Sequence, residues 1–102
     1  MITNLKLKKA NGYVNIAIRA GYTIFGTDNL KGYTHKLYLI LYREDFGKTI
    51  EKTIARFSDI KAIKLSADEF NALVGTDKAK ILAIKNKGIS EQIINILRGE
   101  DG

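Results

Sequence analysis

The pattern of apolar and polar positions predicts an alternation of strands and helices from residue 36 to the end of the chain. Residues 36–42 and residues 80–84 are almost continuously apolar, which is typical of strands covered on both faces. Residues 60–65 form a third predicted strand, and its two lysines favour a position near a sheet edge. Helical segments separate these strands. Short connections and right-handed crossovers then imply a sheet layered between helices.

Capping residues set the ends of one predicted helix clearly. Ser66 and Glu69 have the spacing of a capping box, in which each side chain accepts a hydrogen bond from the other residue's backbone N–H. Gly75 suits the left-handed conformation in which many helices end. Together these residues predict a short helix over residues 67–74.

Two further helices have a single candidate cap each. Asp45 can cap a helix over residues 46–57, in which apolar residues recur at helical spacing. Ser90 can cap a last helix over residues 91–97. The predicted order from residue 36 is therefore strand, helix, strand, helix, strand, helix.

The first third of the chain is ambiguous by periodicity alone. Residues 4–20 place apolar side chains on one helical face, but Val14, Ile16 and Ile18 also alternate as in a strand. Gly12 would cost a helix about 1 kcal/mol relative to alanine. Residues 22–25 are short and strand-like, and the segment that follows can make at most a short helix before Gly32.

A strand-to-helix turn is predicted at Gly26, Thr27, Asp28 and Asn29. Glycine allows backbone conformations closed to other residues, and Thr, Asp and Asn favour helix N-caps. Lys31 follows closely. Backbone N–H groups at a helix start suit an anion such as phosphate. A plain capped turn without a ligand is the alternative, and the residues alone favour it.

Composition and charge narrow the classes of function. A chain of 102 residues with 45% apolar residues predicts one globular domain over residues 1–102. The net charge of +6 and the isoelectric point of about 9.6 favour a polyanionic partner such as nucleic acid. No run approaches the ~20 apolar residues of a membrane span. We therefore expect a soluble cytoplasmic protein with no membrane partner.

The residues offer no convincing catalytic or metal-binding set. There is no cysteine, and His35 is the only histidine, so neither a disulfide nor a zinc site is expected. Gly47, Lys48 and Thr49 match the end of a phosphate-binding P-loop, but Tyr42 stands where its first glycine should be. We expect no enzyme activity, cofactor or small-molecule substrate.

A stripe of cations is predicted on the helix over residues 46–57. Lys48, Lys52 and Arg56 recur every four residues, on the side away from the predicted core. Such a stripe can follow a phosphate backbone. An ordinary solvated surface is the more frequent explanation for such a stripe, and the sequence alone leaves both interpretations open.

Four segments in order resemble the ribosomal protein L-seven-Ae/L-thirty-e superfamily, and its short bacterial members most. Residues 13–26, YVNIAIRAGYTIFG, resemble that family's "LLGLAxRAGxxxxG" opening. Residues 39–45, LILYRED, are similar to its "LVLIAED" strand and turn. Residues 65–75, LSADEFNALVG, are similar to its "FSKEELGxAIG" helix, and residues 80–88, KILAIKNKG, to its "AVVAITDKG" strand and turn. The resemblance covers nearly the whole chain.

The resemblance implies a fold and a function. It implies a three-layer α/β/α sandwich with a mixed sheet of about four strands, and it resolves residues 4–20 as a helix. It also implies a non-enzymatic, ribosome-associated RNA-binding protein that clamps a kink-turn or related bent RNA between two segments. The implied RNA-contacting residues are Gly26, Thr27, Asp28, Asn29 and Lys31 on the first segment and Leu73, Val74, Gly75 and Thr76 on the second. The first group would offer N–H groups, amide edges and a cation, and the second aliphatic side chains to an unstacked base. Lys36, the next cation along the chain, completes the predicted RNA-binding set.

The chain also departs from the family pattern at the first segment. The family motif reads roughly "GTNExxK", whereas here Lys31 comes one residue early and Gly32 takes its place. The segment before residue 37 is about one helical turn shorter than in the family. This shortening favours an alternative function, a protein-interaction or ribosome accessory module that kept the fold and lost the RNA site.

Overall fold

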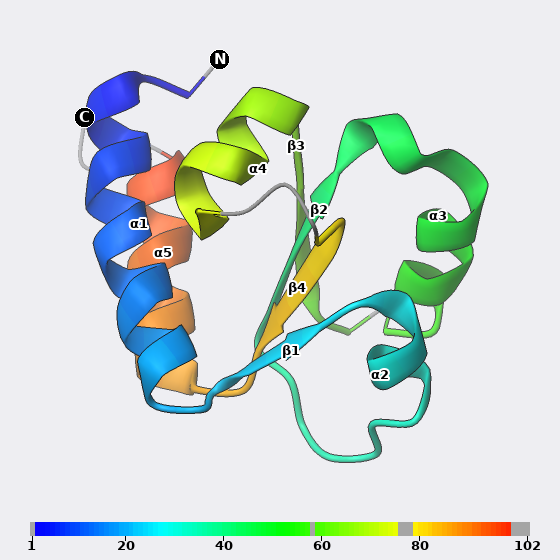
Figure 1. Ribbon diagram of the computed structural model, residues 1–102. Coiled ribbons are helices and arrows are strands. Elements are labelled where there is room, and N and C mark those ends of the chain that lie inside the picture. The colour runs from blue at the N-terminus through cyan, green and yellow to red at the C-terminus, as the bar shows by residue number, and fades with distance from the viewer. Residues whose placement is uncertain (1, 58, 76–78, 99–102) are drawn as a thin grey trace.

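The computed structural model describes residues 2–57, 59–75 and 79–98, which form a mixed α/β domain (Figure 1). Its elements are α1 (Asn4–Arg19), β1 (Thr23–Phe25), α2 (Thr27–Lys31), β2 (Leu39–Arg43), the 3₁₀ turn η1 (Glu44–Phe46), α3 (Gly47–Ala55), β3 (Lys61–Leu65), α4 (Ala67–Val74), β4 (Ile81–Ile84) and α5 (Lys87–Arg98). The predicted order from residue 36 is confirmed. The short helix expected before Gly32 is also present, as α2.

The strands that the structure describes form one mixed sheet with the order β1-β4-β2-β3. β2 and β3 run parallel, whereas β4 runs antiparallel to both β1 and β2. β3 lies at the edge, as the two lysines of residues 60–65 predicted. Because of these directions, the last residues of β1 and β2 lie beside the first residues of β4.

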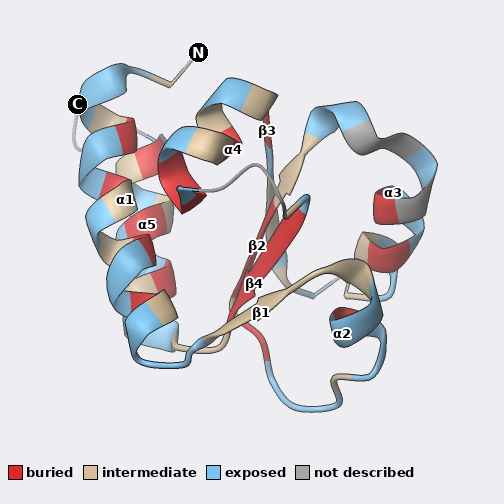
Figure 2. Cartoon of the chain, viewed as in Figure 1, coloured by how far each residue is buried: buried red, intermediate tan, exposed pale blue. Residues whose placement is uncertain are grey.

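The sheet separates two hydrophobic cores. Side chains alternate between the faces of a strand, so Leu39 and Leu41 of β2 belong to one core and Ile40 to the other. Helices α1, α4 and α5 cover the first face, and α2 and α3 cover the second (Figure 1). The buried residues line the sheet and the inner sides of these helices (Figure 2). The predicted three-layer α/β/α sandwich with a four-stranded mixed sheet is confirmed.

Residues 4–19 form a helix, which settles the ambiguity of the first third. Thr3 caps α1 by accepting the N–H of Lys6. Leu7, Ala10, Val14 and Ala17 are its buried residues, and this is the helical spacing. A strand would have turned Ile16 to the same side as Val14, whereas Ile16 is 53% exposed.

The ends of α4 match the prediction residue for residue. The Ser66 N–H donates to the Glu69 carboxylate over 2.9 Å, and the Glu69 N–H donates to the Ser66 hydroxyl over 3.2 Å. Gly75 follows in the left-handed region with φ of 82°. Local capping chemistry therefore sets both ends of this helix.

Two predicted caps are corrected. Helix α5 begins at Lys87, three residues before Ser90, and the Asn86 side chain accepts the N–H of Ile89 over 2.8 Å. Ser90 lies buried inside the helix instead. Asp45 lies in η1, and in the described part of the chain its carboxylate accepts hydrogen bonds from Arg43 rather than from a backbone N–H of α3.

Candidate functional site

The predicted turn at Gly26 joins the end of β1 to α2. Gly26 has φ of 87°, a conformation that favours glycine. Its N–H donates to the Ile81 carbonyl at the start of β4, and its own carbonyl accepts the N–H of Leu30, both over 3.2 Å. The Asn29 side-chain amide donates to the Phe25 carbonyl over 2.8 Å. Hydrogen bonds therefore hold the turn both to β4 and to neighbouring residues of its own segment.

A hollow of about 380 Å³ lies between this turn and the first residues of β4. Its lining residues are Gly26, Thr27, Asp28, Asn29, Ala79, Lys80 and Ile81. The fold thus brings the Gly26 turn against the end of the connection between α4 and β4. Lys80 was not among the predicted site residues, because only the pairing of β1 with β4 places it beside Gly26.

The second predicted segment is less accessible than expected. Leu73 and Val74 are 0% and 5% exposed and belong to the core beneath α1 and α4. The Leu73 carbonyl accepts a hydrogen bond from the Asn11 side chain over 2.8 Å. The expectation that these two side chains contact a base is corrected, since they already pack inside the protein. Gly75 is exposed, and Thr76 lies outside the described residues.

The structure separates Lys36 from the hollow. Lys36 precedes β2, whose first residue pairs with Ile84, whereas the Gly26 turn lies at the Ile81 end of β4. The Lys36 ammonium lies 5.4 Å from the ring centroid of Tyr38, a cation–π arrangement. Lys31 at the end of α2 is exposed and stands beyond the residues that line the hollow.

An ion pair stands at the end of β2. The Arg43 guanidinium donates two hydrogen bonds to the Asp45 carboxylate, over 3.0 and 2.7 Å. These bonds hold the pKa of Asp45 below its ordinary value of 3.8. The arrangement is that of a structural ion pair at a turn.

Within residues 2–57, 59–75 and 79–98, no group of three His, Asp or Glu side chains could hold a metal ion. No helix in that part of the chain is both long and apolar enough to cross a bilayer.

Comparison with known proteins defines the class of the molecule by its fold. No model of a known family matches the chain, and neither does any curated protein. The chain is similar in structure to a protein of unknown function from Bacillus halodurans C, with a TM-score of 0.70 and 15% sequence identity. That similarity covers 89% of this chain and 98% of the other. At this identity the likeness concerns the fold alone, and the chain is a small mixed α/β domain.

Proposed function

We propose that this chain is a small, non-enzymatic RNA-binding protein of the L-seven-Ae/L-thirty-e type that acts on structured RNA in a ribosome-associated role. The observation that carries the proposal is the shared hollow between the Gly26 turn and the start of β4. In the family that the sequence resembles, a glycine turn and the connection before the last strand clamp the RNA together. Here the Gly26 turn lies against the end of that connection, at Ala79 and Lys80.

The chemistry of this surface suits a phosphate backbone. The turn supplies backbone polar groups, the Thr27 and Asn29 side chains and one carboxylate, Asp28, and Lys80 supplies a cation on the opposite wall. The chain carries a net charge of +6, which favours encounter with a polyanion. Leu73 and Val74 are buried, so recognition relies on phosphate and sugar contacts with limited reading of bases.

Fluorescence anisotropy with three labelled RNAs tests the proposal. A kink-turn, a plain duplex and a single strand are each titrated over a salt series. Preference for the kink-turn that persists at physiological salt supports family-type recognition. Equal and salt-labile binding to all three means that net charge acts alone, and the proposed site is then wrong.

A charge-matched pair of variants locates the surface. Lys31→Gln with Lys80→Gln, which removes the cation of the hollow and the cation at the end of α2, should weaken RNA binding and lower the slope of log K against log salt by about 1.5, because two phosphate contacts are lost. Lys8→Gln with Lys9→Gln removes the same charge from exposed positions on α1, in the other helix layer, and should change affinity little. Equal losses of RNA affinity in the two double variants would show that the RNA does not bind at the Gly26 turn.

A protein-interaction module is the second candidate. Helix α2 has only five residues, which leaves little helix to enter a bent RNA. On α1, Leu5 and Ile16 are 64% and 53% exposed. A pull-down from RNase-treated lysate separates the two candidates, since a protein partner survives the treatment and an RNA-mediated one does not.

A further inference from the structure

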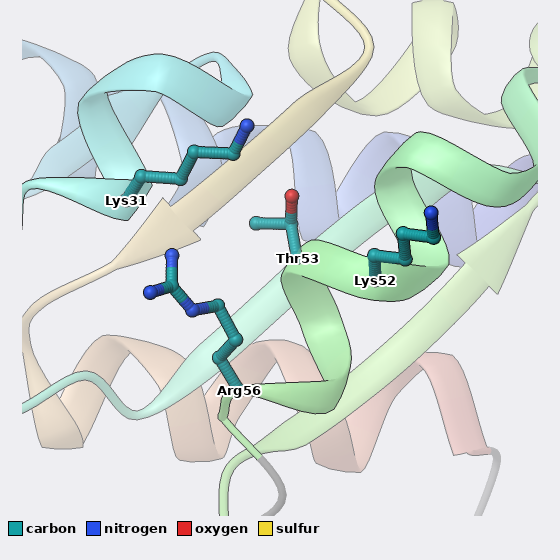
Figure 3. Close-up of a pocket in the computed structure, with 4 residues that line it drawn as sticks. All are labelled: Lys31, Lys52, Thr53 and Arg56. Atoms are coloured by element: carbon teal, nitrogen blue, oxygen red, sulfur yellow. The ribbon is translucent and has the colours of Figure 1, made fainter.

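A second hollow, which we call the α2–α3 cleft, opens between the two helices on one face of the sheet. Its volume is about 520 Å³, and it is lined by Lys31, Lys52, Thr53 and Arg56. Lys31 is the last residue of α2, whereas Lys52 and Thr53 belong to α3 and Arg56 directly follows it. The Lys31 side chain and the Arg56 guanidinium both reach toward the space beside Thr53, while Lys52 extends along α3 (Figure 3).

The basic and acidic residues of α2 and α3 lie at different hollows of the surface. Among the described residues that line the cleft, all except Thr53 are cations. The acidic residues of α2 and α3 are Asp28 and Glu51. Asp28 lines the hollow at the Gly26 turn, and Glu51 lines a hollow beside β3. Within the described residues, no ion pair neutralises Lys31, Lys52 or Arg56. Three like charges repel one another in the free protein, and an anion in the cleft relieves that repulsion.

The inner wall of the cleft is polar at a position where a core residue is expected. Thr53 is 1% exposed and lies on α3 one turn from the buried Ile50. An apolar residue would satisfy the packing of this helix against the sheet. Thr53 instead places a polar side chain on the wall of the cleft that the three cations line.

We propose that the α2–α3 cleft seats a phosphate group, which in the bound complex belongs to the RNA backbone; this inference rests on the proposed function. An arginine fork and lysine ammonium groups are the donors that phosphate oxygens pair with best. The cleft has the volume of a small-ligand pocket, large enough for a nucleotide. Since α2 leads from the Gly26 turn to Lys31, an RNA strand that contacts the turn reaches the cleft along one short helix. Of the three cations predicted to form a stripe on this helix, Lys52 and Arg56 line the cleft, and Lys48 lies outside it.

A double variant on the α3 side tests the cleft. Lys52→Gln with Arg56→Gln removes two of its cations and leaves the Gly26 turn and Lys31 intact. Its matched control is Lys61→Gln with Lys64→Gln, which removes the same charge from exposed positions on the edge strand β3. Far-ultraviolet circular dichroism and thermal melting establish that both variants remain folded. Anisotropy with the tightest-binding RNA is then measured over a salt series.

The expected result is a selective loss. The cleft variant should bind RNA about ten-fold more weakly near 100 mM salt, with a salt slope smaller by about 1.5. The control should lose about two-fold or less, at nearly the wild-type slope. If RNA binds the wild type but the two variants lose equally, the cleft is overturned while the proposed function stands.

A second measurement separates failure of the cleft from failure of the proposed function. If the wild type binds none of the RNAs, the proposed function is wrong, and inorganic phosphate and a mononucleotide are titrated against labelled protein. Saturable shifts in the NMR signals of Lys31 and Thr53, which the cleft variant retains but should not show, would assign the cleft to a free phosphate compound. No shift in that experiment would overturn the cleft as well.

Discussion

Replacing Ser90 with alanine should stabilise the protein, which is the opposite of what its predicted capping role requires. Ser90 is 1% exposed, and in the described part of the chain its hydroxyl oxygen has no hydrogen-bond partner. Its position is inside α5, where the backbone N–H already donates to the Asn86 carbonyl over 3.1 Å. The hydroxyl therefore loses its hydration on folding without compensation.

The change in the free energy of unfolding follows from two contributions that favour alanine and one that disfavours it. A buried polar group without a partner costs about 1–3 kcal/mol, and Ser90→Ala removes that cost. Alanine is also the better helix former, by about 0.5 kcal/mol. The space left by the oxygen costs up to about 1 kcal/mol of packing. The free energy of unfolding should therefore rise by about 1 kcal/mol, which corresponds to an increase in Tm of about 4–8 °C for a domain of this size.

Urea denaturation of the wild type, Ser90→Ala and Asn86→Ala measures the change in the free energy of unfolding for both substitutions. Asn86→Ala removes the side chain that accepts the Ile89 N–H, so it should cost about 1 kcal/mol as a lost N-cap does. The midpoints should move in opposite directions at unchanged m-value. A loss of about 1 kcal/mol in Ser90→Ala would refute the reasoning and would restore Ser90 as a helix cap.

Two further changes are predicted from the backbone and from charge. Gly75→Ala should destabilise the fold by about 1–2 kcal/mol because the φ of Gly75 is 82°. Gly12→Ala, in open space within α1, should stabilise it by about 1 kcal/mol. Thermal melting should therefore show a lower Tm for the first variant and a higher Tm for the second, and equal changes in Tm would contradict the assigned conformations. Asp45→Asn should make the free energy of unfolding depend less on pH at acidic pH. The hydrogen bonds from Arg43 lower the pKa of Asp45 in the folded protein below 3.8. The ionised carboxylate therefore stabilises the fold above the pKa of the unfolded state, and this contribution is lost as the pH falls through the pKa of the folded state. A carboxyl NMR titration of Asp45 with its midpoint at or above 3.8 would count against this pairing.

The elements of the fold could be predicted wherever the signal was local. The capping box at Ser66 and the glycine at residue 75 depend on neighbours a few residues away, and the ends of α4 were correct. Ser90 carries the same local signal, yet Asn86 is the residue whose side chain begins α5. Both residue types cap helices well, and packing of α5 against the sheet and α1 decides which one is used.

The candidate site was predictable only in part. The Gly26 turn was found because glycine suits its positive φ, but the expected side-chain cap was wrong, since Gly26 itself is the N-cap of α2 and has no side-chain hydrogen bond. Leu73 and Val74 were expected to pack against an unstacked base, but their burial depends on how α4 packs in the core with α1. Lys80 carried no signal in the sequence, since its place beside Gly26 requires β1 to pair with β4 across more than fifty residues.

The amino-acid sequence by itself determined the alternation of helices and strands, the edge position of β3 and the excess of positive charge. These properties follow from side-chain periodicity, capping and composition, each of which acts within a few residues or over the whole chain. Only the tertiary structure decided that β4 lies between β1 and β2. It also brought Lys31 and Arg56 to the same cleft. The physical reason is that strand pairing and helix packing join segments far apart in the chain, where no local pattern records the partner.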